Sequence, residues 1–494
     1  MLPKRCRNLT VILLCAAPLA GCAVGPDFER PEAPGVLNYT PDPALTATSS
    51  APVPGGAVQH VLRGRDIPGE WWQVFRSEAL NRLITEALKA NPDLQAAQAT
   101  LRQAQENAAA GRGALFPTVT ASGSGTREKP STATTGVRTP AYSLFNASVD
   151  VSYDLDVFGG TRRNIEALQA AADYQRFQLE ASYLSLTANV VTAAIQVASF
   201  RAQIAATEDI IKAQRGQLEI LRQRFALGGV SQADVASQEA TVAQTEATLP
   251  PLQKQLAQQR NQLAIYLGRF PSQIDGDTFQ LDQFALPHDL PLSLPSQLVQ
   301  QRPDIRSAEA QLHQASANVG VAVANMLPQF SLSASYGSGA LSFANLFSPG
   351  TIAWSLASSL VQTIFDGGTK LHQKRAAEAG FDAAAAQYRS TVLSAFQDVA
   401  NSLHAVQYDA DTLRAQLAAE LAAQRSLAIA RDQYQAGATT YATVLTAQAA
   451  YAQARISRIQ AQAARFSDTA ALFQALGGGW WNRTDVAAGT APQR

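Results

Sequence analysis

The feature that most constrains this chain is an internal repeat with a nearly constant spacing. Asn91-Pro92-Asp93-Leu94 returns 211 residues later as Arg302-Pro303-Asp304-Ile305. Leu267-Gly268 returns as Leu476-Gly477, 209 residues later. So steady an offset indicates a duplication in which both halves have the same order of elements. We assign the chain to a leader (1–21), an N-terminal segment (22–76), a first repeat (77–285), a second repeat (286–481) and a C-terminal tail (482–494).

Each repeat is predicted to begin with a short helix. Pro92 suits the first turn of a helix with Asn91 as its cap, and Pro117 blocks any continuation beyond about Leu115. The second copy is predicted from Pro303 to about Met326.

Two strands are predicted after each short helix. In the second repeat apolar and small polar residues alternate over 330–336 and again over 352–357, and the first repeat alternates in the same way over 148–154. Period two is typical of transmembrane β-strands, although half-buried strands of soluble proteins alternate too. Four strands leave open edges, which lipid does not tolerate, so several copies must close a barrel. Three copies would give a workable 12 strands.

A very long helix then follows in each repeat. Thr161 to Leu227 contains no proline, and at about 1.5 Å per residue it would reach roughly 100 Å. Apolar residues recur at every seventh position, which predicts supercoiling against a neighbouring helix. The two columns are Tyr183, Val190, Val197, Ile204, Ile211, Leu218, Phe225 and Val392, Val399, Val406, Leu413, Glu420, Leu427, Tyr434, with one charged member.

Glycines are predicted to end the long helices and reverse the chain at 228–229 and at 437. Shorter helices then return to about Gly268 and Gly477. Pro250-Pro251 should kink the first of them.

The first 21 residues have the layout of a secretory signal. They contain three basic residues, no acidic ones and an apolar run over 9–17 that is too short to span a bilayer. The run ends in Leu19-Ala20-Gly21-Cys22, which resembles a bacterial lipobox, in which cleavage precedes a cysteine that is then acylated. The alternative is an ordinary signal site that happens to end in cysteine. Ala23 in place of aspartate favours the outer membrane as the destination.

Catalytic and metal-binding patterns are missing from the sequence. The five histidines are scattered without metal-ligand spacing, and there is neither a phosphate-binding glycine loop nor a nucleophile elbow. A formal net charge of zero gives no reason to expect nucleic acid. We therefore expect no enzyme, cofactor or metal. Trp71-Trp72 and Trp480-Trp481 are interpreted as anchoring aromatics rather than sugar platforms.

Several motifs together resemble one known family. They are Gly25-Pro26-Asp27-Phe28, Trp71-Trp72, Asp156-Val157-Phe158-Gly159-Gly160, Arg302-Pro303-Asp304-Ile305, Phe365-Asp366-Gly367-Gly368 and Leu476-Gly477-Gly478-Gly479-Trp480. The chain resembles the outer membrane factor family of TolC-like efflux proteins, and more closely its lipoprotein branch, often labelled NodT-type. The resemblance implies a mainly α fold with membrane β-structure. It further implies a homotrimer in which a 12-stranded transmembrane β-barrel continues into a long periplasmic α-helical barrel.

The resemblance also implies a periplasmic tip formed by the turns that begin at Gly228 and Gly437. Relatives close this tip with a leucine constriction and an aspartate ring, whose positions match Ala442 and Thr446 here. Both residues depart from the family pattern. Asp234 is the nearest acidic candidate for a charged constriction, and the alternative is an acid that stabilises a helix N-terminus.

Tyr434 and Tyr441 are interpreted as packing residues of the tip rather than gate members.

The sequence therefore predicts the outer-membrane channel of a tripartite efflux system that exports small molecules such as drugs. Its expected partners are two further copies, a periplasmic adaptor protein, an inner-membrane transporter of the resistance-nodulation-division type and outer-membrane lipid. A duct for type I protein secretion is the first alternative, and a structural coiled-coil lipoprotein is the second.

Overall fold

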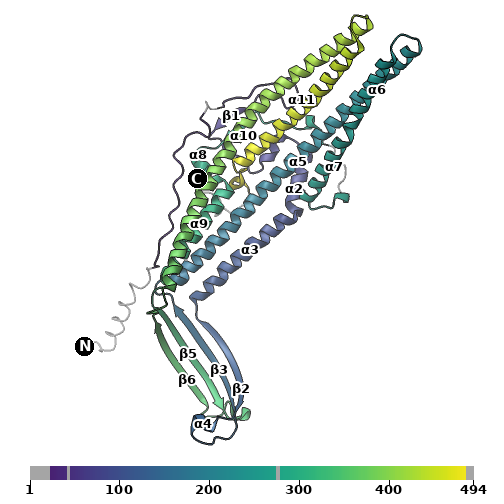
Figure 1. Cartoon of the computed structure of the whole chain (residues 1–494). Coiled ribbons are helices and arrows are strands. Elements are labelled where there is room, and N and C mark those ends of the chain that lie inside the picture. Colours follow the sequence, from purple (N-terminus) through teal and green to yellow (C-terminus); the bar gives the residue numbers. More distant parts are fainter. Residues whose placement is uncertain (1–22, 42–44, 274–278, 485–494) are drawn as a thin grey trace. The chain divides into compact units, whose positions relative to one another are not determined.

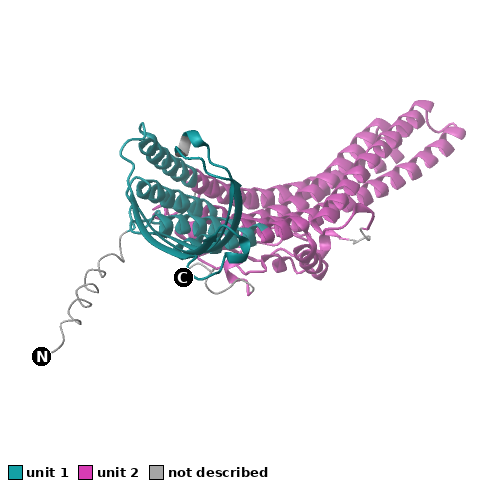
Figure 2. Cartoon of the chain, turned by 90° about the horizontal axis from the view of Figure 1, so that it is seen from below, with its two compact units in different colours: residues 1–31, 100–176, 307–389 teal, residues 32–99, 177–306, 390–494 magenta. Residues whose placement is uncertain are grey.

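The computed structural model describes residues 23–41, 45–273 and 279–484, which form two compact units (Figures 1 and 2). Unit 1 comprises Met1–Pro31, Thr100–Arg176 and Ser307–Arg389, and unit 2 comprises Glu32–Ala99, Phe177–Arg306 and Ser390–Arg494. The predicted leader, Cys22 and residues 485–494 of the predicted tail lie outside the described residues.

Unit 1 contains a four-stranded antiparallel sheet in the order β2-β3-β5-β6. One hairpin comes from each repeat, and β3 and β5 pair in the middle. The loop of the first hairpin carries a short helix, α4 (Thr132–Thr135). The strands are β2 (Thr118–Glu128), β3 (Tyr142–Leu155), β5 (Gln329–Ala340) and β6 (Ile352–Val361). Figure 2 shows the strands curving as one sheet.

The register of this sheet separates two chemically different faces. Thr120, Asp150, Ser335 and Ser355 form one row across the four strands. The next row consists of Ala121, Val149, Tyr336 and Trp354. Directly paired residues of antiparallel strands share a face, and successive rows alternate between faces. One face is therefore rich in hydroxyl groups, and the other is apolar and exposed, with Trp354 76% accessible.

The two longest helices, α5 (Gly160–Ala226) and α10 (Thr369–Gln435), contain 67 residues each. An aspartate caps the start of both. The carboxylate of Asp156 accepts hydrogen bonds from the backbone N–H groups of Thr161 and Arg162, and that of Asp366 accepts from Gly368 and Lys370. These bonds satisfy donors that a helix N-terminus leaves unpaired. The predicted short helices are α3 (Pro92–Arg112) and α9 (Pro303–Ala324).

Within unit 2, most of the predicted heptad column of α10 is buried. Val392, Val399, Val406, Leu413 and Leu427 of α10 are buried. Their charged companion, Glu420, accepts a 2.7 Å hydrogen bond from Arg458, which explains how the column tolerates an acid. Arg458 belongs to α11 (Tyr441–Ala475).

In the first repeat the proline pair does more than kink the returning helix. The structure has two helices, α6 (Gln232–Ala247) and α7 (Leu249–Tyr266), with the prolines in the first turn of the second. Proline lacks the N–H that a continuous helix requires, and the first turn is where its absence costs nothing.

Unit 2 also contains short elements that the sequence did not predict. They are α2 (Glu78–Ala90), α8 (Pro295–Gln301) and a parallel ribbon of β1 (His60–Arg63) with β4 (Asp289–Leu292). Trp71 stacks on Phe473 at 5.6 Å between ring centroids, and Trp480 packs edge-on against Phe177. Both tryptophans are buried, so neither offers a face to a sugar.

One described helix, α5, contains an 18-residue window with a mean hydropathy of 1.3, and 67% of that window is buried in the chain. A mostly buried core helix has this length and hydropathy as readily as a membrane span does. No cluster of three or more potential metal ligands occurs within the described ranges.

Candidate functional site

The predicted tip residues Gly228 and Gly437 end the two long helices in the same way. Their φ angles are +75° and +72°, a region that residues with a Cβ rarely adopt. The Gly228 N–H donates to the backbone carbonyl of Phe225 at 2.9 Å, and the Gly437 N–H donates to the backbone carbonyl of Tyr434 at 3.1 Å. In both tips the N–H of the residue after the glycine donates to the carbonyl one position before that acceptor. This second bond completes a Schellman motif. The glycines thus set where the chain turns back.

Asp234 lies in a capping box at the start of α6. Its carboxylate accepts hydrogen bonds from the Ser231 N–H at 3.1 Å and the Ser231 hydroxyl at 2.8 Å, and the hydroxyl oxygen accepts from the Asp234 N–H at 3.1 Å. The corresponding Thr440 makes no side-chain cap at α11. The structure therefore places Asp234 at a helix N-terminus, as the alternative interpretation expected, and a charged constriction there remains a prediction.

Tyr441 lies inside the second tip. Its side chain is buried, its hydroxyl donates a 2.7 Å hydrogen bond to Gln238, and its ring centroid lies 5.1 Å from that of Tyr434. Burial raises the pKa of Tyr441 well above its ordinary value, with Tyr434 adding to the effect. The hydrogen bond links α11 to α6, so Tyr441 joins the two hairpins of the tip.

The matched gate positions Ala442 and Thr446 lie one turn apart on the exposed face of α11. The Thr446 hydroxyl donates to the Ala442 carbonyl at 3.0 Å. Neither side chain offers the bulk or the charge that the family pattern places there.

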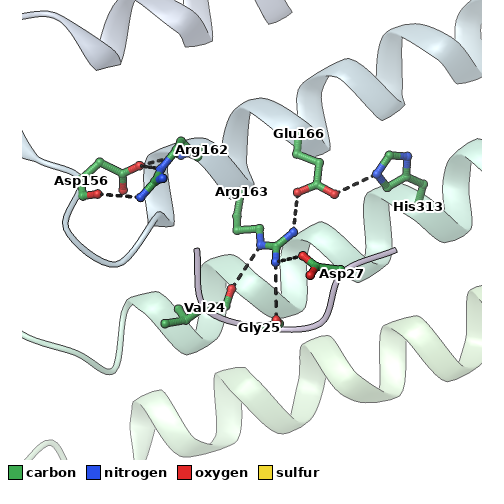
Figure 3. A network of polar contacts seen from close by, with 8 residues as sticks. All are labelled: Val24, Gly25, Asp27, Asp156, Arg162, Arg163, Glu166 and His313. Carbon is green, nitrogen blue, oxygen red and sulfur yellow. Dashed lines mark hydrogen bonds and ion pairs between the residues drawn. The ribbon is translucent and has the colours of Figure 1, made fainter. Parts of the chain in front are cut away.

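A second constellation lies in unit 1, where residues 23–30, here called the strap, run along α5 and α9 (Figure 3). The buried Arg163 guanidinium donates hydrogen bonds to the Val24 carbonyl at 3.2 Å, the Asp27 carboxylate at 2.6 Å and the Glu166 carboxylate at 2.8 Å. Glu166 in turn contacts His313 at 2.9 Å. One arginine therefore ties the strap to α5 and, through Glu166, to α9.

The strap explains the Gly25-Pro26-Asp27-Phe28 motif. Gly25 has a φ of +94°, and a Cβ there would collide with the Gly320 backbone. The Phe28 ring stacks on His313 with 4.3 Å between centroids. The sequence singled out this motif but not its partners Arg163 and His313, because nothing local marks residues separated by more than 130 positions as neighbours.

The N-terminal end of the strap lies at the junction of β3 and α5. The Val24 N–H donates to the Phe158 carbonyl at 3.0 Å, and a methyl group added to Gly159 would meet the Ala23 backbone. Ala23 is thus held at the end of the strand, beside the start of the long helix.

Comparison with known proteins identifies the family. The sequence model described as "Outer membrane efflux protein" matches this chain twice, over residues 83–269 and 294–478. The chain belongs to the outer membrane efflux protein family. One match falls in each of the two predicted repeats.

Curated relatives of this efflux family extend over nearly the whole chain. The probable efflux pump outer membrane protein TtgC of Pseudomonas putida is 30% identical over 97% of both chains. The pyoverdine export outer membrane protein OpmQ of Pseudomonas aeruginosa is 32% identical over 83% of this chain and 87% of its own.

Solved structures show the same fold. The outer-membrane channel OprN has a TM-score of 0.84 at 28% identity and covers 93% of this chain. The open MtrE channel of Neisseria gonorrhoeae has a TM-score of 0.80 at 26% identity and covers 94%. Both matches cover 100% of the solved chain. The chain is therefore an outer-membrane efflux channel protein, as the sequence predicted.

Proposed function

We propose that three copies of this chain close a 12-stranded barrel in the outer membrane and enclose an export duct. The observation that carries the proposal is the open sheet of unit 1, in which β2 and β6 each lack a second neighbour among the described strands. Unpaired backbone groups are not tolerated in lipid, so pairing of β6 with β2 of another copy is the simplest closure. Sedimentation of the detergent-extracted protein should give the mass of three chains. A monomer would contradict the proposal.

The two faces of the sheet support the same arrangement. The apolar row containing Trp354 would contact lipid, and the hydroxyl row containing Ser335 would line water. Single cysteines introduced at 330–336 test this in intact cells. The proposed acylation blocks the sulfur of Cys22, so that residue should not react with the label. Cysteines at Ser331, Ser333 and Ser335 should react with a charged maleimide, and those at Leu332, Ala334 and Tyr336 should not. Uniform labelling would favour a spacer without a membrane barrel.

The lipid anchor is proposed at Cys22. Support comes from its neighbour Ala23, which is held beside Gly159 where β3 ends and α5 begins. A lipid attached one residue earlier would therefore start next to the end of the transmembrane sheet. Mass spectrometry of the mature N-terminus should find an acylated cysteine, and Cys22→Ser should abolish the added mass. An N-terminus that begins elsewhere would exclude the anchor.

The proposed role of the duct is small-molecule efflux together with a periplasmic adaptor and an inner-membrane transporter, of the resistance-nodulation-division type. Relatives named for antibiotic, toluene and pyoverdine export support this over protein secretion. We expect no catalytic activity. Expression in a drug-sensitive host that lacks its own channel, together with the cognate adaptor and pump, should restore resistance. Secretion of a protein substrate without a change in drug resistance would favour the alternative.

Closure of the tip is proposed to depend on Asp234 for its charge and on Tyr441 for the packing of the hairpins. Ala442 and Thr446 lack the groups that relatives are expected to use, so a constriction at those positions would have to be weaker. The Asp234 carboxylate accepts its capping bonds at the start of α6, where the helix dipole favours a negative charge.

A further inference from the structure

Asp150 stands out among the residues of the four-stranded sheet. These strands, all described, contain four charged residues: Arg127, Glu128, Asp150 and Asp154. Arg127 pairs with Ser143, seven residues along β3 from Asp150, or about 23 Å at the usual strand rise. The central part of the sheet therefore carries acidic charge without a basic residue to balance it.

Hydroxyl groups from three strands hold the Asp150 carboxylate. Ser148 donates to it at 2.7 Å, and Ser335 of β5 and Ser122 of β2 also hydrogen-bond to it. Ser122 and Ser148 are themselves 2.8 Å apart. An ionised carboxylate accepts several hydrogen bonds at once, so these donors fix the position of the negative charge on the sheet.

The register places Asp150 on the hydroxyl face. Its direct neighbours are Thr120 and Ser335, while Val149 and Val151 on either side belong to apolar rows. If the apolar face contacts lipid, Asp150 faces the lumen. Three copies would place three such carboxylates at the same height around the wall.

We propose that Asp150 is a specificity-determining residue that makes the strand-lined part of the duct favour cations and cationic solutes over anions. This inference rests on the proposed function, because it requires a water-filled barrel of several copies. A fixed negative charge raises the local concentration of counter-ions near it. Asp154, on the same face and nearer the end of β3, adds to the same charge.

Reversal potentials of purified protein in planar bilayers under a KCl gradient test the proposal. Asp150→Asn should lower the K⁺ to Cl⁻ permeability ratio by about threefold, and Asp150→Glu should retain it, as expected when each copy loses one partly screened unit charge. Ser152→Asn is the matched control, since it places the same amide on the same face of β3 without removing a charge. The effect should grow as the salt falls from 1 M to 0.1 M, where the Debye length rises from about 3 to about 10 Å.

Two outcomes overturn the idea and are distinguishable. If the wild-type chain conducts with cation preference and Asp150→Asn leaves that preference unchanged, Asp150 does not set it, and a loss confined to Asp234→Asn would assign it to the tip instead. If the wild-type protein forms no ion-conducting channel at all, the proposed function itself fails.

Discussion

The Arg163 guanidinium donates a 2.6 Å hydrogen bond to the Asp27 carboxylate, and the two partners differ sharply in exposure. The arginine side chain is 6% accessible and the aspartate side chain is 91% accessible. The buried partner also binds Glu166 and the Val24 carbonyl. Arg163, rather than the ion pair itself, should therefore hold the strap in place.

Arg163→Ala is expected to release the strap at a cost of about 2 kcal/mol, because it removes a buried guanidinium together with its hydrogen bonds to the Val24 carbonyl and to Glu166. Limited proteolysis within residues 23–31 should become measurably faster. Asp27→Asn is the control and should cost less than about 1 kcal/mol, since exposed ion pairs contribute little. Equal cleavage rates in both variants would show that the strap is held by other contacts.

Two carboxyl groups of unit 2 predict a pH-dependent stability. Asp409 of α10 lies beside Asp468 of α11, and two neighbouring carboxylates repel each other when both are ionised. Burial, aided by Asp468 and opposed by Arg465, raises the pKa of Asp409 to about 7. Since an unfolded aspartate has a pKa of about 3.9, the native state binds the extra proton between about pH 4 and 7. Stability should therefore fall as the pH rises through that window.

Asp409→Asn should flatten this dependence, because an amide cannot ionise. Its thermal midpoint should exceed that of the wild type at pH 8 by about 2 °C and match it near pH 5. Asp411→Asn, which removes a neighbouring exposed acid paired with Arg414, should leave the pH profile unaltered. A wild-type midpoint that rises with pH between 5 and 8 would contradict the assignment.

Two substitutions in the capping box of the first tip test the structural role and the electrical role of Asp234 separately. Ser231→Ala removes the cap but keeps the charge, and should destabilise the start of α6 by about 1 kcal/mol without altering ion preference. Asp234→Asn removes the charge and should raise conductance while it lowers cation preference, because the proposed closure of the tip depends on that charge. Hydrogen exchange at 231–236 and bilayer recordings measure the two effects. Unchanged conductance in Asp234→Asn would leave the residue as a helix cap alone.

Tyr441→Phe should loosen the contact between the two tip hairpins. The change removes the hydrogen bond to the buried Gln238 amide, at an expected cost of about 1 kcal/mol, while the ring still packs against Tyr434. Faster hydrogen exchange at 436–445 and a larger open fraction in bilayers should follow. Tyr434→Phe is the control, and an equal effect from both changes would argue against a specific role for the Tyr441 hydroxyl.

The long helices could be predicted because proline and glycine mark their ends. The sequence placed the first at Thr161 to Leu227, and the structure has it at Gly160–Ala226. Asp234 also carried a local signal, since Ser231 followed three residues later by an acid is a capping-box pattern. Features that depend on residues close along the chain were thus accessible to sequence reasoning.

The elements that were not predicted depend on distant partners. β1 has four residues and pairs with β4, so that His60 lies opposite Asp289. Arg163 meets Asp27 across 136 positions. Neither pairing leaves a periodic pattern, because a short strand or a single arginine is stabilised by tertiary contacts rather than by its own propensity.

The equal length of α5 and α10 restricts how this protein can change over evolutionary time. Deleting one heptad from either helix would withdraw its turn by about 10 Å relative to the other, at the usual rise per residue. The Tyr441–Gln238 bond between the hairpins could not then form. Length variants should consequently arise only as paired insertions or deletions, one in each half of the gene.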